Sequence, residues 1–472
     1  MTTNDIIKQK KIDVLFIIPP YHHRRGSGSF FPLGISSIIS CLEERGFTWD
    51  YIDCTKMIES LREESLKQLE EKLSNQLKDY APLLVGIGPC VTPGAKGLKV
   101  VANSCLKYFD KEMVFAGGPF ASLLSQEWFF YDYLNIKYLI KGDGEYAVCD
   151  AINTLKKGLI LSECNAISFR GYSCINYIED INSIPFPKRI DIERNRLSDR
   201  RRRNNHDKVA QIVGSRGCPY HCDFCFSGNT TKAYRKRSPD NIVEEMKQLV
   251  DKYQVTDIVF YDDCFFSSPQ KVHSELKDFC NTILNVGLTV SWQIEIRPDT
   301  LISIADEELL LLTKCGCRQI NIGIERTGEN GATAFGKAFC FEKLRGFIMH
   351  LHEICPIRVT GTFILGGKDE TKESIRQMIK ESTSIFLDDA EFSPLFVYPE
   401  TNLYDCYFSD PQSWFDIIER ENEPWGEIVY ENKNLTKDDI IALVDEAYSF
   451  FYKDKRTDSS RHITDRYNLK EL

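Results

Sequence analysis

The first third of the chain alternates between short apolar runs and longer stretches with helical spacing. The apolar runs cover residues 12–18, 48–53, 83–88, 113–118 and 138–140. A helical pattern over 32–42 and a long amphipathic stretch over 57–80 separate the first three runs. Short apolar runs are typical of strands buried on both faces of a parallel sheet. The alternation predicts a doubly wound, Rossmann-like α/β domain that binds ligands at the carboxyl ends of its strands.

A second series of strands and helices begins near Val209. Its expected strands cover residues 211–213, 258–261, 289–296, 319–325, 358–365 and 389–397. Helical patterns lie between them, for example over 241–253 and 306–314. Repeated strand-then-helix units that close on themselves predict a partial (β/α)6 barrel, again with its chemistry at the carboxyl ends of the strands.

These two series suggest where the domains begin and end. We expect a first domain over 1–180, a linker over 181–207, a barrel over 208–400 and a small, mostly helical segment over 401–472. Within the linker, the run Arg200–Arg203 is expected to be a solvated face. The C-terminal segment has one clear helical pattern, over 437–452, and we expect it to cap the barrel and to help select a substrate.

Composition and charge exclude several classes of protein. Hydrophobic residues make up 42% and charged residues 27% of the chain, which is ordinary for a soluble globular protein. The net charge of −10 argues against a general nucleic-acid binder. No apolar run is long enough to span a membrane, and the N-terminus lacks an apolar signal-peptide core. The 17 scattered cysteines indicate reduced thiols, so we expect a cytoplasmic protein.

Three cysteines lie close together in a C-x3-C-x2-C pattern: Cys218, Cys222 and Cys225. Three thiolates on one loop can hold a cubic iron–sulfur cluster by three of its four irons and leave the fourth open to a ligand. A zinc site would normally show paired C-x2-C units and four ligands. Cys315 and Cys317 form a C-x-C pair, which leaves an auxiliary cluster as an alternative.

This cysteine pattern resembles the radical S-adenosylmethionine (SAM) superfamily, and the resemblance covers roughly residues 205–400. It implies a [4Fe-4S] cluster on Cys218, Cys222 and Cys225, whose open iron binds SAM. It also implies an external electron donor of the flavodoxin or ferredoxin type, because one electron cleaves SAM to methionine and a 5′-deoxyadenosyl radical. Phe224, just before the third cysteine, is implied to pack near the adenine.

Later strands end in residues that the same resemblance assigns to SAM. Asp263 follows the second barrel strand, Glu295 and Arg297 end a middle strand, and Glu325 lies in a Gly-x-Glu pattern. Carboxylates suit ribose hydroxyls, and an arginine suits the SAM carboxylate. Gly366, the first of two glycines, is implied to let the backbone approach the cofactor. Each polar residue taken singly is equally well explained by a helix cap or an ion pair.

The first domain resembles the cobalamin-binding domain of cobalamin-dependent radical SAM enzymes. The resemblance rests on Pro32-Leu-Gly34, Ala116-Gly-Gly-Pro119 and Gly142-Asp-Gly-Glu145. It implies cobalamin contacts at Gly117, Gly118, Gly142, Gly144 and Glu145.

Glycine suits such positions because a side chain would block the close approach of a corrinoid. The cobalamin motif D-x-H-x-x-G is absent, so no histidine has an obvious claim to be the lower cobalt ligand. His22 and His23 remain candidates to face the corrinoid. Loss of cobalamin binding, with a domain that only shapes the pocket, is the alternative.

Together these resemblances imply a cobalamin-dependent radical SAM methyltransferase that acts on an unactivated carbon of a natural product or peptide. Two alternatives stay open. One is a radical enzyme that does not methylate and instead carries out cyclisation, ring contraction, epimerisation or carbon–sulfur bond formation. The other is a corrinoid-binding module without turnover. No recognition motif for a leader peptide or for nucleic acid is visible, so the substrate is left undefined.

Overall fold

The computed structural model describes residues 9–20, 30–58, 61–91, 94–194, 208–230, 234–327, 335–337, 339–420 and 429–453. These residues form two compact units. Unit 1 takes in the described parts of 1–23, 31–190 and 408–428, and unit 2 takes in those of 24–30, 191–407 and 429–472. Within the described ranges, no helix combines the length and the apolar character needed to cross a bilayer.

Unit 1 is built on a six-stranded sheet in the order β2-β1-β3-β4-β5-β6. Its strands are β1 (Lys10–Ile18), β2 (Trp49–Asp53), β3 (Tyr80–Ile87), β4 (Val114–Gly117), β5 (Tyr138–Ile140) and β6 (Ser168–Phe169). The first five strands run parallel, and β6 pairs antiparallel with β5. The strand order reverses between β1 and β3, which is where sheets of this kind bind ligands.

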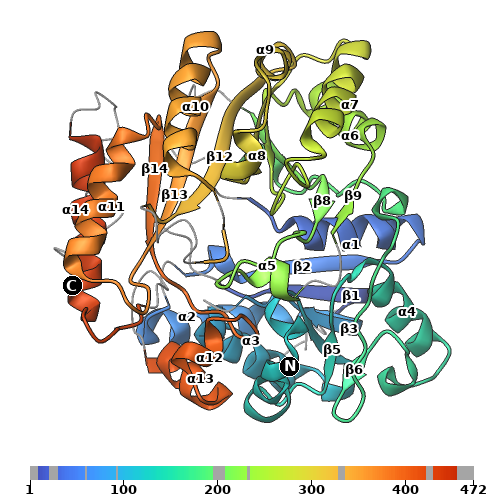
Figure 1. Ribbon diagram of the computed structural model, residues 1–472. Helices are drawn as coiled ribbons and strands as arrows, with labels where there is room; N and C mark the ends of the chain where they lie inside the picture. Colours follow the sequence, from blue (N-terminus) through green and yellow to red (C-terminus); the bar gives the residue numbers. More distant parts are fainter. Residues whose placement is uncertain are drawn as a thin grey trace, which may run out of the picture. The chain divides into compact units, whose positions relative to one another are not determined.

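Helices cover both faces of this sheet (Figure 1). The helices are α1 (Leu33–Glu44), α2 (Glu63–Leu77), α3 (Ala95–Tyr108) and α4 (Glu145–Lys156). Helices α1 and α4 pack together, as do α2 and α3. Helix α2 buries only Leu69, Leu73 and Leu77, a single stripe at four-residue spacing. It is shorter than the predicted stretch over 57–80 because the chain already enters β3 at Tyr80.

Unit 2 contains a second six-stranded sheet, in the order β14-β13-β12-β11-β10-β7. Its strands are β7 (Val209–Ile212), β10 (Asp257–Phe260), β11 (Ser291–Ile296), β12 (Cys317–Glu325), β13 (Arg358–Leu365) and β14 (Asp389–Pro394). All neighbours are parallel and follow the order of the chain, as in a partial barrel. A small antiparallel pair, β8 (Ser215–Arg216) and β9 (Arg235–Lys236), lies beside it.

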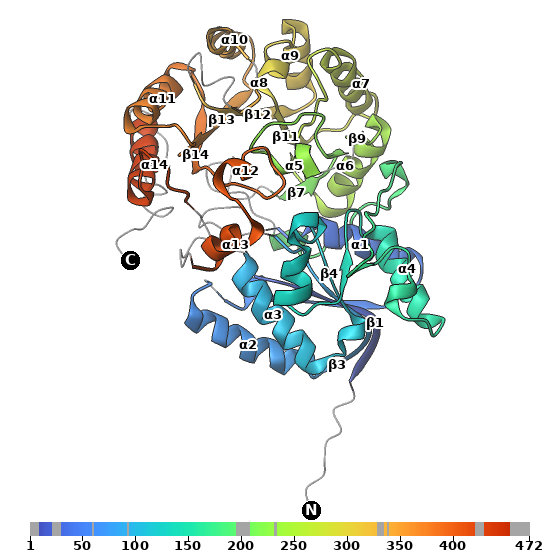
Figure 2. The ribbon, with the colours of Figure 1, turned by 60° about the horizontal axis from the view of Figure 1, so that its bottom comes forward.

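Helices surround the sheet of unit 2, as Figure 2 shows. They are α6 (Pro239–Tyr253), α7 (Val272–Asn285), α8 (Pro298–Leu301), α9 (Asp306–Lys314), α10 (Phe341–Ile354) and α11 (Lys372–Ser384). Along β11, Trp292, Ile294 and Ile296 belong to the apolar core shared with these helices. Gln293 and Glu295 therefore lie on the opposite face of the strand, toward the inside of the barrel.

The C-terminal part of the chain contributes helices to both units. These are α12 (Tyr404–Tyr407), α13 (Pro411–Arg420) and α14 (Lys437–Tyr452). In unit 1, Trp414 of α13 is fully buried with its ring centroid 6.1 Å from that of Phe120. In unit 2, the hydroxyl of Tyr448 on α14 donates to the carbonyl oxygen of Phe392 on β14 at 3.1 Å. The domain boundaries given above stay a prediction, as does the capping role of this segment.

Candidate functional site

The loop with the three cysteines, which we call the cysteine loop (residues 217–225), lies between β8 and helix α5 (Phe226–Thr230). Two aspartates that follow β10 hold its ends. Asp262 accepts hydrogen bonds from the backbone N–H of Gly214 (2.9 Å) and from the hydroxyl of Ser215. Asp263 accepts a hydrogen bond from the hydroxyl of Ser227 at 2.8 Å. The loop is thereby anchored at the carboxyl end of the barrel strands, where barrel enzymes place their chemistry.

The middle of the cysteine loop is held through Asp223. Its backbone N–H donates to the carbonyl oxygen of Phe335, and its carbonyl oxygen accepts from the N–H of Leu403, both at 3.1 Å. The side-chain amide of Asn402 donates to its carboxylate at 2.8 Å. Next to it, the ring of Phe224 packs edge-on against Phe335 with centroids 5.0 Å apart. Two segments far along the chain therefore brace the cysteine loop.

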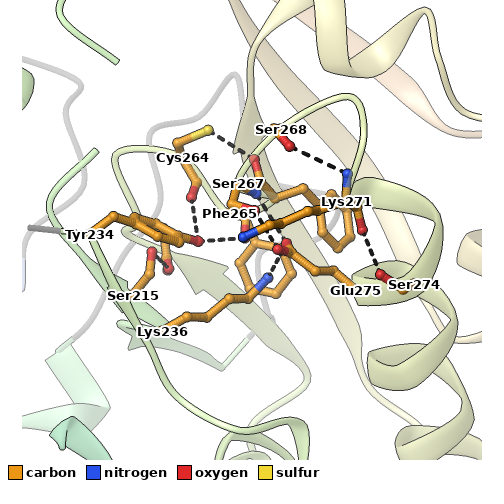
Figure 3. A network of polar contacts seen from close by, with 12 residues as sticks. Ser215, Tyr234, Lys236, Cys264, Phe265, Ser267, Ser268, Lys271, Ser274 and Glu275 are labelled. Carbon is orange, nitrogen blue, oxygen red and sulfur yellow. Dashed lines mark hydrogen bonds and ion pairs between the residues drawn. The ribbon is translucent and has the colours of Figure 1, made fainter. Parts of the chain in front are cut away.

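A polar network supports the turn that follows Asp263 (Figure 3). Lys236 and Glu275 form an ion pair at 2.7 Å, and Glu275 also accepts a hydrogen bond from the backbone N–H of Ser267 at 3.0 Å. The hydroxyl of Tyr234 donates to the carbonyl oxygen of Cys264 at 3.3 Å. These contacts come from Tyr234 just before β9, from β9, from α7 and from the turn itself, so they fix the position of Cys264.

The three thiols of the cysteine loop have different surroundings. A hydrogen bond with Cys264 lowers the pKa of Cys218 to about 7. Burial raises the pKa of Cys222 and that of Cys225. The sulfur of Cys222 accepts a hydrogen bond from Nη1 of Arg297 at 3.3 Å. Cys222 therefore has a positive charge next to it, which favours its thiolate form.

Iron–sulfur clusters are held by thiolates, so the donor set of this loop fits such a cluster. In the part of the chain that is described, no three His, Cys, Asp or Glu side chains are gathered closely enough to hold a metal ion. The cluster would be held by the thiols of Cys218, Cys222 and Cys225. The backbone already brings two of them near each other, because the N–H of Cys225 donates to the carbonyl oxygen of Cys222 at 3.0 Å.

Arg297 lies next to the cysteine loop. Only 8% of the residue is exposed, and its guanidinium lies 3.9 Å from the ring centroid of Tyr220. Burial opposes its charge, but the ion pair with Asp299 at 3.0 Å outweighs burial and raises its pKa. Glu295, two residues earlier on β11, is exposed. The SAM contacts predicted for Arg297, Glu295 and Asp263 stay predictions.

Glu325 ends β12 and is paired with a residue that the sequence did not single out. Its carboxylate Oε1 lies 2.7 Å from Nζ of Lys337. The same Nζ donates to the carbonyl oxygen of Gly323 at 3.0 Å and lies 5.6 Å from the ring centroid of Phe224. The amino-acid sequence just before Lys337 shows no strand or helix periodicity, so the sequence gives no signal for this contact.

The two glycines after β13, Gly366 and Gly367, bind the carboxylate of Glu370 through their backbone N–H groups. Glu370 accepts hydrogen bonds from the N–H groups of Gly366 (2.7 Å) and Gly367 (2.8 Å) and pairs with Nε of Arg326 at 3.1 Å. The guanidinium of Arg326 lies 4.6 Å from the ring centroid of Phe335. Gly366 has a φ of +90°, and a Cβ there would lie 3.0 Å from Ile440 of α14. Helix packing therefore accounts for this glycine, and its approach to a cofactor stays a prediction.

In unit 1, Gly117 and Gly118 lie at the carboxyl end of β4. The carbonyl oxygen of Gly117 accepts a hydrogen bond from the N–H of Cys90 at 2.8 Å, and the N–H of Phe120 donates to the carbonyl oxygen of Cys90 at 3.0 Å. Gly118 has a φ of +121°, and a Cβ there would lie 2.5 Å from the nitrogen of Cys90. The loop after β3 and the loop after β4 thus contact each other at Gly118, where no side chain fits.

The Gly142–Glu145 turn follows β5. The N–H of Gly142 donates to the hydroxyl of Ser122 at 3.0 Å, and the N–H of Asp143 donates to the carbonyl oxygen of Asn176 at 3.0 Å. Glu145 begins α4, is only 3% exposed and accepts a hydrogen bond from Ser37 of α1 at 2.8 Å. It therefore joins two helices within unit 1.

Four of the predicted cobalamin-contacting residues present backbone at this edge of the sheet. Gly117, Gly118, Gly142 and Gly144 are all partly or wholly exposed, which fits a large ligand with many amide groups. His22 and His23 lie outside the described residues, as does the run Arg200–Arg203. The described residues of unit 1 contain no histidine, so none of them supplies an imidazole as lower cobalt ligand.

Comparison with known proteins agrees with the cysteine motif and with the fold. Residues 212–381 match the sequence model of the Radical SAM superfamily. The uncharacterized methyltransferase PH0819 of Pyrococcus horikoshii is 23% identical over 453 residues, which cover 94% of this chain and 93% of the relative. The anaerobic magnesium-protoporphyrin IX monomethyl ester cyclase of Rubrivivax gelatinosus is 23% identical over 411 residues, with 83% and 69% covered.

Among solved structures, the radical SAM methyltransferase TsrM of Kitasatospora setae, with cobalamin and a [4Fe-4S] cluster bound, has the same fold. The TM-score is 0.61 at 18% sequence identity, with 84% of this chain and 77% of that chain covered. The fold class predicted from the sequence is confirmed, since the doubly wound unit, the partial barrel and the helical C-terminal part are all present. Residues 212–381 are therefore similar to the radical SAM superfamily, and the chain has the fold of TsrM.

Proposed function

We propose that the protein is a cobalamin-dependent radical SAM methyltransferase that methylates an unactivated carbon. One observation carries the proposal: a loop with Cys218, Cys222 and Cys225 is clamped at the carboxyl end of the barrel strands by Asp262 and Asp263. The names of two similar proteins, PH0819 and TsrM, support methyl transfer as the reaction.

The residues around the cysteine loop have complementary roles in this proposal. Cys218, Cys222 and Cys225 would hold a [4Fe-4S] cluster, which with SAM and one electron from an external donor would supply a 5′-deoxyadenosyl radical, and cobalamin would supply the methyl group. Arg297, which is buried and charged, orients the SAM carboxylate by paired hydrogen bonds. Asp263, Glu295 and Glu325 accept hydrogen bonds from ribose hydroxyls or the amino group.

An apolar surface beside these polar groups would receive the adenine. Phe224 and Phe335 pack on each other next to Asp223 of the cysteine loop. Aromatic rings of this kind bury the base and exclude water from the reacting groups. In unit 1, Gly117, Gly118, Gly142 and Gly144 would meet cobalamin through their backbone, while Glu145 keeps α1 and α4 in place.

We infer a small-molecule or peptide substrate, an external electron donor of the flavodoxin or ferredoxin type, and a cytoplasmic location. All 17 cysteines are free, which fits a reducing compartment.

A second candidate function is radical chemistry without methyl transfer. It is supported by the similarity to the anaerobic cyclase of Rubrivivax gelatinosus, which covers 83% of this chain. The two reactions differ in the mass of the product, because methylation adds one methylene and ring closure removes hydrogen. A corrinoid-binding module without turnover would cleave no SAM at all.

The proposal is tested on protein reconstituted anaerobically with iron, sulfide and cobalamin and then freed of unbound ligand. Iron, sulfide and cobalt contents are measured for the wild type and for Cys222→Ser. Cys406→Ser is the matched control, because Cys406 is an exposed cysteine of α12 outside the cysteine loop. We expect the wild type and Cys406→Ser to hold a cluster and cobalt, and Cys222→Ser to lose the iron.

Reduced protein is then given SAM, and cleavage to 5′-deoxyadenosine is followed by chromatography. Bound cluster without SAM cleavage would contradict an enzyme of this class. Bound cluster without cobalt would leave a radical SAM enzyme and would favour the second candidate function.

A further inference from the structure

Lys337 is a largely buried cation that the proposed chemistry does not yet use. Its side chain is 11% exposed, and that of its partner Glu325 is 9% exposed. The distance between Nζ and Oε1 of Glu325 is 2.7 Å, and the second hydrogen bond runs to the carbonyl oxygen of Gly323 at 3.0 Å. A buried ammonium is costly unless it is paired, so this position requires Glu325 to stay where it is.

Glu325 in turn has an unusual backbone conformation. Its φ of 63° lies in the left-handed region, which a residue with a side chain rarely adopts. The pairing of β12 with β13 shifts in register between Gly323 and Glu325. Such conformations persist where the surroundings enforce them, and they cluster at functional sites. Here the two hydrogen bonds of Lys337 tie together both residues that flank the irregularity.

The two carboxylate oxygens of Glu325 have different surroundings. Oε1 is taken by Lys337, whereas the described residues provide no hydrogen-bond donor to Oε2. The ammonium also lies 5.6 Å from the ring centroid of Phe224 in the cysteine loop. Lys337 thus contacts the end of β12 and faces the aromatic residue next to the third cysteine.

We propose that Lys337 is a positioning residue for SAM binding, which holds Glu325 in its left-handed conformation so that Oε2 accepts a hydrogen bond from SAM. This inference rests on the proposed function, because it takes Glu325 as part of the SAM site. Lys337 acts through Glu325 and has no contact with the reacting atoms of its own.

The test compares the wild type with Lys337→Gln, Lys337→Arg and Glu325→Gln, all as full-length protein with the cluster reconstituted. The dissociation constant of SAM is measured by equilibrium dialysis with the cluster kept oxidised, so that SAM is not cleaved. Iron content and the thermal unfolding midpoint are measured on the same samples. Lys372→Gln is the matched control, because Lys372 forms an ion pair with Asp439 at 2.6 Å on the surface of unit 2.

We expect Lys337→Gln to weaken SAM binding on the order of tenfold, which lies within the range of coupling energies between residues in contact. Iron content should stay at the wild-type level. Lys337→Arg, which keeps the charge, should lose less, and Lys372→Gln should bind SAM as the wild type does. Wild-type SAM affinity in Lys337→Gln with a full cluster would overturn the inference.

The double variant Glu325→Gln/Lys337→Gln covers the case in which Lys337→Gln fails to fold, because it leaves no unpaired buried charge. Its SAM affinity should equal that of Glu325→Gln, since a residue that acts through another adds nothing once that other is removed. A further loss in the double variant would overturn the inference. A wild-type protein that holds the cluster but binds no SAM would overturn the proposed function and this inference with it.

Discussion

The side-chain amide of Asn402 donates a hydrogen bond to the carboxylate of Asp223 across 2.8 Å, although the two residues are 179 positions apart. Asp223 lies between the second and third cysteines of the cysteine loop, and Asn402 precedes the short helix α12. Together with the backbone bond from Leu403, this contact ties the chain after β14 to the loop.

Loss of this contact should loosen the cysteine loop. We expect Asn402→Ala to lose its reconstituted cluster to a ferrous chelator about threefold to tenfold faster than the wild type, the range of one partly exposed hydrogen bond. The rate is followed by the decay of the cluster absorbance. Asn182→Ala is the control, because Asn182 makes the same kind of bond to Asp180 at 2.8 Å in unit 1. Equal rates in all three proteins would contradict the clamp.

Asp262 should make the stability of the folded protein depend on pH. Burial raises its pKa from 3.8 to about 6. Between these values the unfolded chain releases a proton that the native state still holds, so the free energy of unfolding falls as the pH rises from about 4 to about 6. The loss is up to about 3 kcal/mol, at 1.36 kcal/mol per pKa unit.

Asp262→Asn removes this ionisation. Relative to the wild type, the variant should therefore gain stability by up to about 3 kcal/mol between pH 4 and pH 7. Urea unfolding of both proteins without cofactors, at a series of pH values, gives the difference. Parallel curves for the two proteins would show that Asp262 is ionised in the native state throughout.

Gly118 offers a test of the cobalamin site that separates backbone strain from close packing. Gly118→Ala places a Cβ in a left-handed backbone and 2.5 Å from the nitrogen of Cys90. Gly171→Ala causes similar strain at a φ of +90°, but nothing lies within 4 Å of its Cβ. We expect Gly118→Ala to lose most of its bound cobalt after reconstitution and Gly171→Ala to keep it. Cobalt content is measured by atomic spectroscopy, and full cobalt in Gly118→Ala would place the corrinoid elsewhere.

Much of the fold could be predicted from the sequence because its strands and helices have strong local signals. The strands Tyr138–Ile140 and Arg358–Leu365 and the helices Asp306–Lys314 and Lys437–Tyr452 have the bounds that the hydrophobic pattern predicts. The last of these begins after Thr436, whose hydroxyl accepts a hydrogen bond from the N–H of Asp439, so its start is set by local chemistry.

Residues whose role depends on tertiary contacts have no local signal in the sequence. The three cysteines are recognisable because their spacing is local. The ion pair between Lys337 and Glu325, in contrast, forms only in the folded protein. The same holds for Arg326, which the sequence places after Glu325 and the structure places against Phe335 and Glu370. Periodicity also cannot tell which apolar core a helix joins. The pattern of α13 is that of an ordinary amphipathic helix, yet Trp414 belongs to unit 1.

The path of the chain at its C-terminal side has a consequence for how this architecture can be rearranged. The chain leaves unit 2 after residue 407, supplies α13 to unit 1 and returns to unit 2 at residue 429. Neither unit is therefore a single continuous stretch of sequence. A gene fragment that ends before α13 would encode a first unit without Trp414 and Phe415, both of which are buried among its aromatic residues. Recombination that exchanges one unit for another thus needs more than one junction, which favours inheritance of the pair as a whole.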